Sequence, residues 1–197
     1  MKVGELDYLG YITAIANVPS IIDAGILSHN RARRRSHIDI SMESVQDIRA
    51  RKRVPGGLVL HDYACLYVCA RNVMLYKRCL TMRDELCVLA VEPAVLDLPD
   101  VVIADHNAAA SIAAFGSYPD GVEALDYDKI FARYWTHPED PMAEDRHRKE
   151  MCAEVLIPHR VDPAFIREAY VASSTARTGF ADLGIDRNVT IKSDRFF

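Results

Sequence analysis

The sequence predicts an α+β fold, because strand-like and helix-like segments follow one another without regular alternation. Short runs rich in β-branched and aromatic residues indicate strands at residues 8–15, 63–69, 86–91, 101–104 and 152–157. Helical spacing or capping signals indicate helices at residues 20–27, 44–53, 108–115, 127–135 and 163–170. The chain contains no GxGxxG and no GxxxxGK[ST] pattern, which speaks against a Rossmann or P-loop phosphate site.

The boundaries of the first elements follow from local turn chemistry. The first strand runs into Asn17-Val18-Pro19-Ser20, where an Asn cap and an early proline favour a helix start. Ser44 is the expected N-cap of a basic helix that Pro55-Gly56-Gly57 would stop. The two signals together place one short helix and one basic helix between the first two strands.

The predictions of the later elements depend more on the composition of each segment. Residues 63–69 and 152–157 are nearly continuous apolar runs, typical of buried strands. Residues 108–115 are alanine-rich, residues 127–135 show an amphipathic pattern, and Pro163 opens the last predicted helix. Residues 137–148 are polar with two prolines, so we expect a long loop there.

Size and composition indicate one globular domain, residues 1–197. Half of the residues are hydrophobic and 26% are charged, and no apolar run approaches the roughly 20 residues that cross a bilayer. Residues 1–9 carry Glu5 and Asp7 and lack the apolar region of a secretory signal. The five cysteines do not form a zinc pattern and suit a reduced interior. We therefore expect a cytoplasmic protein with no membrane contact and no metal.

Charge is distributed unevenly along the chain. Residues 29–53 contain eight Lys or Arg and three acids, a local charge of +5, whereas the whole chain carries −4. A basic block on an acidic body favours an anionic ligand held at one place. A solvated charged loop explains the same pattern equally well.

Glu154 is the most informative single acid. It lies among Cys152, Val155, Leu156 and Ile157, and a carboxylate inside an apolar strand is costly unless it is paired or used. The alternative is that Glu154 points outward from an alternating strand.

Four segments, in order, carry a family resemblance. Asn17-Val18-Pro19-Ser20-Ile21 with Gly25-Ile26-Leu27-Ser28 is similar to Asn-Leu-Pro-Ser-Ile and Gly-Leu-Leu-Ser. Residues 45–76, with Arg49 and Arg71-Asn72-Val73-Met74-Leu75-Tyr76, are similar to a strand and a Pro-Arg-Ser-Pro-Met-Leu-Tyr turn. Asp105-His106-Asn107-Ala108-Ala109 is similar to Asp-Gly-Asn-Ala-Ala, and Ala153-Glu154-Val155-Leu156 to Ala-Glu-Phe-Leu. In this order and spacing, the segments resemble the DNA ADP-ribosyltransferase toxin family DarT.

The resemblance implies an ADP-ribosyltransferase-like fold, with two small β-sheets around an NAD cleft and flanking helices. It implies transfer of ADP-ribose from NAD to a base in single-stranded DNA, within a toxin–antitoxin pair whose macrodomain antitoxin removes the modification. Glu154 would hold the donor ribose, and Arg49 would stabilise the acceptor base as it loses a proton.

The resemblance also suggests residues that bind the two substrates. Those expected at NAD are Tyr11, Ile12, Thr13, Ser20, Ser28, Arg71 and Met74. Those expected at the nucleic acid are Arg51, Arg53 and Arg148. For Arg51 and Arg53, a solvated helix face is the alternative.

The sequence departs from the family in several places: Ala64 and Cys65 soften the aromatic strand, and three further positions differ. Tyr11 stands where members often have His, Ala14 replaces a second His, and Val73 replaces Pro. Two alternatives therefore stay open. One is the same donor chemistry, or NAD hydrolysis, with a non-DNA acceptor; the other is a catalytically silent module that binds NAD or nucleic acid.

Overall fold

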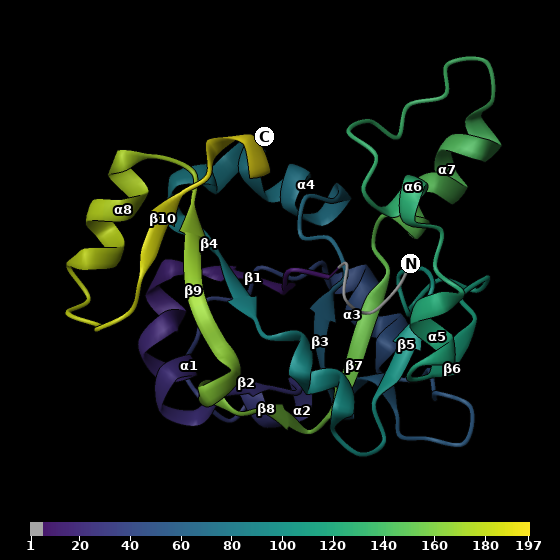
Figure 1. The fold of residues 1–197 in the computed structure, drawn as a ribbon, viewed down its shortest axis with the longest axis horizontal. Coiled ribbons are helices and arrows are strands. Elements are labelled where there is room, and N and C mark those ends of the chain that lie inside the picture. Colours follow the sequence, from purple (N-terminus) through teal and green to yellow (C-terminus); the bar gives the residue numbers. More distant parts are fainter. Residues whose placement is uncertain (1–5) are drawn as a thin grey trace.

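The computed structural model describes residues 6–197, and part of the segment used to judge a secretory signal, including Glu5, lies outside them (Figure 1). Its eight-stranded sheet has the order β10-β9-β4-β1-β3-β7-β5-β6. The strands are β1 (Leu9–Ala14), β3 (Tyr63–Tyr67), β4 (Leu86–Val91), β5 (Val102–Ala104), β6 (Phe115–Ser117), β7 (Glu154–Pro158), β9 (Ile166–Val171) and β10 (Val189–Ile191). A second sheet pairs β2 (Ile26–Leu27) with β8 (Arg160–Val161).

Helices cover both ends of the large sheet. They are α1 (Val18–Ala24), α2 (His29–Ala32), α3 (Glu43–Arg49), α4 (Val73–Met82), α5 (Asp120–Glu123), α6 (Tyr127–Ile130), α7 (Pro141–Glu150) and α8 (Ser174–Ala181). In Figure 1, α1 and α8 lie on the side of β9, whereas α5, α6 and α7 lie on the side of β7. Within residues 6–197, no helix is both long enough and apolar enough to cross a membrane.

The large sheet is divided near its middle. β1 pairs with β4 at six positions and β3 pairs with β7 at five, but β1 and β3 share only the pair Gly10 and Tyr67. Two four-stranded halves therefore meet at one point and diverge beyond it. The α+β fold expected from the sequence is confirmed, and this division gives the two half-sheets that flank the site.

The core extends over both faces of β4. Cys87, Leu89 and Val91 belong to one apolar cluster, while Leu86, Val88 and Ala90 belong to another. All six residues of β4 are buried, so the strand shows no polar alternation in the sequence.

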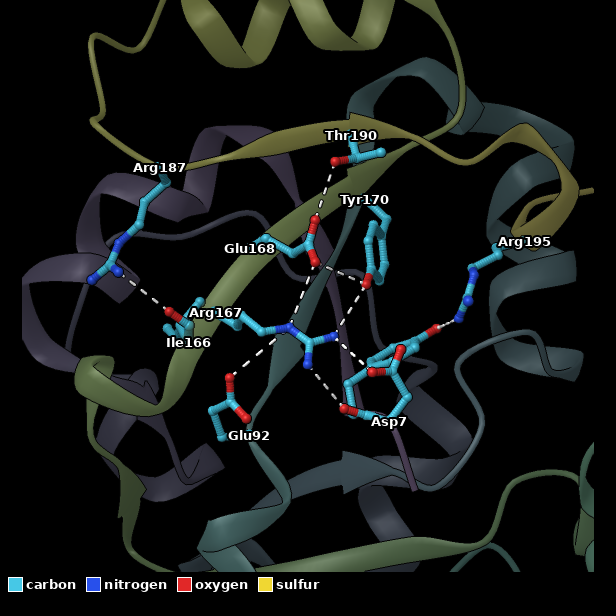
Figure 2. Close-up of polar contacts among 10 residues, drawn as sticks. Asp7, Glu92, Ile166, Arg167, Glu168, Tyr170, Arg187, Thr190 and Arg195 are labelled. Carbon is cyan, nitrogen blue, oxygen red and sulfur yellow. Dashed lines mark hydrogen bonds and ion pairs between the residues drawn. The ribbon is translucent and has the colours of Figure 1, made fainter. Parts of the chain in front are cut away.

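At the β9 edge, a polar network joins distant segments. Arg167 on β9 donates to the backbone oxygen of Asp7 (3.1 Å) and to its carboxylate (3.2 Å) (Figure 2). Glu168 accepts from Thr190 of β10 at 3.1 Å and from Tyr170 at 3.1 Å (Figure 2). These contacts fix the first described residues and the last strand to the sheet.

The prediction of a loop at residues 137–148 was wrong, because α7 begins at Pro141. The Asp140 side chain accepts from the backbone N–H groups of Met142 and Ala143, and Pro141 stands in the first turn, where its missing N–H costs nothing. Lys149 forms an ion pair with Asp145 one turn away. The proline here starts a helix rather than breaking one.

Two predicted helices were also wrong. Residues 108–114 form turns, because the Asp105 carboxylate accepts from Ala114 N at 2.8 Å and closes the loop before β6. Pro163–Phe165 is a single 3₁₀ turn, and β9 follows because residues 166–171 pair with β4. In both places tertiary contacts override local propensity.

Three further helices have different limits from those predicted, and the first of them, α1, spans Val18–Ala24 rather than residues 20–27. Helix α6 ends at Ile130, short of residue 135. Helix α3 starts at Glu43 after Met42, so Ser44 is not its N-cap, and it ends at Arg49, well before Pro55.

Candidate active site

A cleft of about 540 Å³ lies where the two halves of the sheet diverge. β1 contributes Tyr11, Ile12 and Thr13 to its lining, and β3 contributes Cys65 and Tyr67 from the other half. The single pairing of Gly10 with Tyr67 thus sets the spacing of the two walls. Residues between 37 and 49, the start of α4 and the end of α7 contribute much of the remaining lining.

Arg49 and Glu154 form a buried ion pair in this cleft. Arg49 Nη1 donates to Glu154 Oε1 at 3.0 Å, and Nη2 donates to Oε2 at 2.8 Å. Arg49 is 7% exposed and Glu154 is 1% exposed. The backbone N–H of Ala108 also donates to Glu154 Oε1, at 3.3 Å. Glu154 therefore points inward, and its burial is tolerated because both carboxylate oxygens are bonded.

The two residues of this pair come from different elements of the fold. Arg49 is the last residue of α3, and Glu154 is the first residue of β7, in register with Tyr67 of β3 and Ala104 of β5. The carboxylate thus stands on a strand that is paired on both sides. Such a position is rigid, as a preorganised charge requires.

Neutral polar groups surround the pair. Arg49 Nη2 also donates to Cys65 Sγ at 2.8 Å. Burial raises the pKa of the Cys65 thiol to about 12 and the pKa of Tyr11 to about 12. Both groups are therefore protonated at neutral pH, which leaves Arg49 and Glu154 as the charges among these four residues.

A histidine pair lies elsewhere in the cleft lining. The rings of His29 and His61 stack with centroids 4.0 Å apart and an interplanar angle of 24°. His61 Nε2 lies 2.9 Å from Gln46 Oε1. Burial lowers the pKa of both imidazoles below the ordinary value of 6.5. This part of the cleft lining is therefore neutral and aromatic at neutral pH.

The histidine pair predicts how stability depends on pH. Because both folded-state pKa values are lowered, the unfolded chain binds more protons below about pH 6.5, and the free energy of unfolding falls as the pH falls through that range. Urea unfolding at pH 7.5 and 5.5 should show this loss, and it should be smaller in the double variant His29→Asn, His61→Asn. The exposed His159→Asn, outside the cleft lining, is the control. An unchanged pH slope in the double variant would contradict the assignment.

Several residues predicted from the sequence line this cleft. They are Tyr11, Ile12, Thr13, Arg49, Met74, Arg148 and Glu154. Thr13 Oγ1 accepts from Asn17 Nδ2 at 3.2 Å, which fixes the hydroxyl toward the start of α1. Arg148 comes from the last turn of α7 rather than from a loop.

The other predicted residues lie outside the cleft lining. Ser20 is half-buried in α1, and Ser28 is buried at the start of α2. Arg51 and Arg53 are exposed and donate to the backbone oxygens of Asp47 and Gly57. Arg71 lines a different hollow, with its guanidinium 4.1 Å from the centre of the Phe197 ring.

The structure also adds residues to which the sequence assigned no role. His29, His61 and Cys65 line the cleft, and so does Asn107 in the turn after β5. Periodicity carries no signal for them, because His29, His61 and Asn107 come from irregular segments or single turns. Cys65 lies in a predicted buried strand, where a cysteine is an ordinary core residue.

Potential metal ligands are not gathered at this site. Among residues 6–197, no group of three or more His, Cys, Asp or Glu side chains is arranged to hold a metal ion. The five cysteines are all free thiols.

The divided α+β sheet is that of the ADP-ribosyltransferase fold. The chain belongs to the DarT family, because the family model described as "ssDNA thymidine ADP-ribosyltransferase, DarT" matches residues 11–197.

Relatives and solved structures agree with this assignment. The chain is 31% identical to a DNA ADP-ribosyl transferase of Thermus sp. (strain 2.9), over 83% of this chain and 80% of that protein. It is 30% identical to a DNA ADP-ribosyl transferase–DNA ADP-ribosyl glycohydrolase fusion protein of Thermosipho africanus, over 96% of this chain but 48% of the fusion. The chain thus spans about half the length of that relative.

The structural similarity extends over the whole fold. Thermus sp. 2.9 DarT in complex with ADP-ribosylated ssDNA matches with a TM-score of 0.81 and 25% identity, covering 100% of this chain and 99% of that one. Thermosipho africanus DarTG in complex with ADP-ribose matches with a TM-score of 0.80 and 27% identity, covering 96% of this chain and 51% of that one.

Proposed function

We propose that this chain transfers ADP-ribose from NAD to a thymine base in single-stranded DNA and releases nicotinamide. The Arg49–Glu154 pair, buried in the cleft between the sheet halves, is the observation that carries the proposal. The bond between the ribose C1′ and nicotinamide breaks, a bond from C1′ to a ring nitrogen of the base forms, and the proton of that nitrogen is released to water. Family membership and the Thermus complex with ADP-ribosylated ssDNA support DNA as the acceptor.

Glu154 suits the donor side of this reaction. Departure of nicotinamide leaves positive charge on the ribose, and a fixed carboxylate in a water-poor cleft stabilises such charge. Glu154 is held by Arg49 and Ala108, so it needs no reorganisation to act. We assign Glu154 to the ribose hydroxyls and to the developing charge.

Arg49 suits the acceptor side. Burial opposes the charge of Arg49, but the Glu154 carboxylate outweighs it and raises the pKa of the guanidinium well above its ordinary value. A group with so high a pKa stays protonated and is a poor base. Arg49 therefore stabilises the base as its ring nitrogen loses the proton, and the neutral Tyr11 and Cys65 bring no competing charge.

The roles of the other predicted residues follow from whether they line the cleft. Tyr11, Ile12, Thr13 and Met74 are assigned to NAD, and Arg148 to the acceptor strand. Ser20, Ser28, Arg51, Arg53 and Arg71 receive no role in the cleft, because they lie outside its lining. NAD acts as a co-substrate, and no step is assigned to a metal.

The biological setting is part of the same proposal. We propose that residues 1–197 act as one transferase domain in the cytoplasm and that a macrodomain antitoxin reverses the modification. The natural fusion of a DNA ADP-ribosyl transferase with a DNA ADP-ribosyl glycohydrolase in Thermosipho africanus supports such a partner.

Labelled NAD tests the proposed acceptor directly. The protein should transfer label to a thymine-containing single strand and lose most of that activity when the strand is annealed to its complement, because pairing hides the base edge. Glu123→Gln, an exposed carboxylate on α5, should behave like the parent protein.

Other outcomes select the alternatives. Label on RNA or protein, with none on DNA, would support the same donor chemistry with a different acceptor, and release of nicotinamide with no labelled acceptor would support NAD hydrolysis. No turnover of NAD under any condition would leave a binding module.

A further inference from the structure

A second hollow, of about 460 Å³, lies beside the cleft. Val68, Cys69 and Arg71, after the end of β3, line this hollow, whereas Val73 and Met74, at the start of α4, line the cleft. Only Asn72 separates the two sets. The turn at the end of β3 is therefore a ridge between two adjoining hollows.

That ridge is held rigidly. Asn72 is fully buried, and its side chain accepts from the backbone N–H groups of Met74 and Leu75 while donating to Cys69 O at 3.0 Å. The segment that contains α6 and α7 also contributes to both hollows. Residues 127–133 line the second hollow, and residues 145–149 of α7 line the cleft. A chain lying across the ridge would therefore meet fixed surfaces on both sides.

Arginines give this hollow its charge. Arg71 donates to Arg133 O at 2.8 Å, and Arg195 lies 5.0 Å from the centre of the Tyr8 ring. Two carboxylates, Asp7 and Asp194, also line it, but the Asp7 carboxylate is bound by Arg167 at 3.2 Å (Figure 2). Guanidinium groups thus outnumber the carboxylates left to balance them, which favours an anion.

Exposed rings complete the lining. Tyr127 and Phe131 stack with centroids 4.4 Å apart, and they are 36% and 40% exposed. Large rings left partly in solvent beside arginines are typical of surfaces that bind single-stranded nucleic acid, where phosphates meet guanidinium groups and bases stack on the rings.

We propose that this hollow binds the nucleotides of the acceptor strand that flank the target base. Arg71 and Arg133 contact the backbone phosphates, and Tyr127 with Phe131 forms a platform for one flanking base. The inference rests on the proposed function, since it places the target base of the same strand in the cleft across the ridge. It also gives Arg71 a role on the acceptor strand in place of NAD.

Fluorescence anisotropy of labelled DNA without NAD tests this inference separately from catalysis. We expect the protein to bind a single strand of about 12 nucleotides at least tenfold more tightly than one of about 4, because longer strands reach the second hollow. The double variant Phe131→Ala, Arg133→Ala should bind the long strand about tenfold more weakly and the short one nearly as the parent does. The slope of log K against log salt should become shallower by about 0.7 for each phosphate that the variant no longer neutralises.

The controls make the result decisive. Arg177→Ala removes an exposed arginine on α8 that lines neither the hollow nor the cleft, and it should bind both strands as the parent does. The double variant should also keep the parent's melting temperature and its KM for NAD. Equal affinity of the parent for long and short strands, or an unchanged long-strand affinity in the double variant, would overturn the inference even if transfer to DNA occurs.

Discussion

Glu154→Gln is expected to reduce ADP-ribose transfer at least about 100-fold, because it removes the fixed negative charge from the cleft. It also leaves the Arg49 guanidinium, 7% exposed, without its counter-charge. Breaking a buried ion pair by removing one partner costs about 3–5 kcal/mol, and the amide retains part of the hydrogen bonding, so we expect a decrease in stability toward the lower end. Nicotinamide release and urea unfolding measure the two effects.

A double variant separates catalysis from stability. Arg49→Met with Glu154→Leu removes both charges and fills the space with apolar groups, so its free energy of unfolding should exceed that of Glu154→Gln. The transferase activity of the double variant should be no higher than that of Glu154→Gln. If the double variant were the less stable of the two, the broken ion pair would not be the cause of the reduced stability. If Glu154→Gln kept near-parent activity, the role of Glu154 would be wrong.

The next largest effect is expected at the junction between the sheet halves. A Cβ on Gly10 would lie 2.5 Å from the Cβ of Ala70, and both residues are buried. Gly10→Ala should therefore force β1 away from the end of β3 and cost about 1–3 kcal/mol through overpacking. Because β1 and β3 pair only at Gly10, the same movement should widen the cleft and raise the KM for NAD.

A compensating change tests the steric cause. Gly10→Ala combined with Ala70→Gly moves the methyl group to the other side of the contact and should recover most of the stability and the KM for NAD. Chemical denaturation and steady-state kinetics of the two single variants and the double variant measure this coupling. No recovery in the double variant would show that the destabilisation arises elsewhere.

Local patterns predicted β1, β3, β4, β5 and β7, because each is an apolar run with clear ends, but they missed β2, β6, β8, β9 and β10. The limits of β4 agree with the prediction at residues 86–91. Helix α7 was missed because Pro138 and Pro141 suggest a broken segment, although a proline in a first turn is favourable. The Ala-rich residues 108–114 have helical propensity, but the Asp105 carboxylate bonds Ala114 and holds them in turns.

The sequence predicted individual residues of the site but not how they are arranged. Arg49 and Glu154 are 105 positions apart, and no spacing rule shows that they meet. Closeness in the sequence is no better a guide. Arg71 stands three residues before Met74 and yet lines a different hollow. The direction of a side chain at a turn depends on the fold around it, here on the buried Asn72.

The mass of a thymine-containing single strand after incubation with the protein and NAD tests the central proposal most directly. We expect the strand to gain one ADP-ribosyl group, with release of one equivalent of nicotinamide. Glu154→Gln should modify the strand and consume NAD at least about 100-fold more slowly, and Glu123→Gln should act as the parent does. An unmodified strand in the presence of folded parent protein, or a modified strand with Glu154→Gln at the parent rate, would contradict the account.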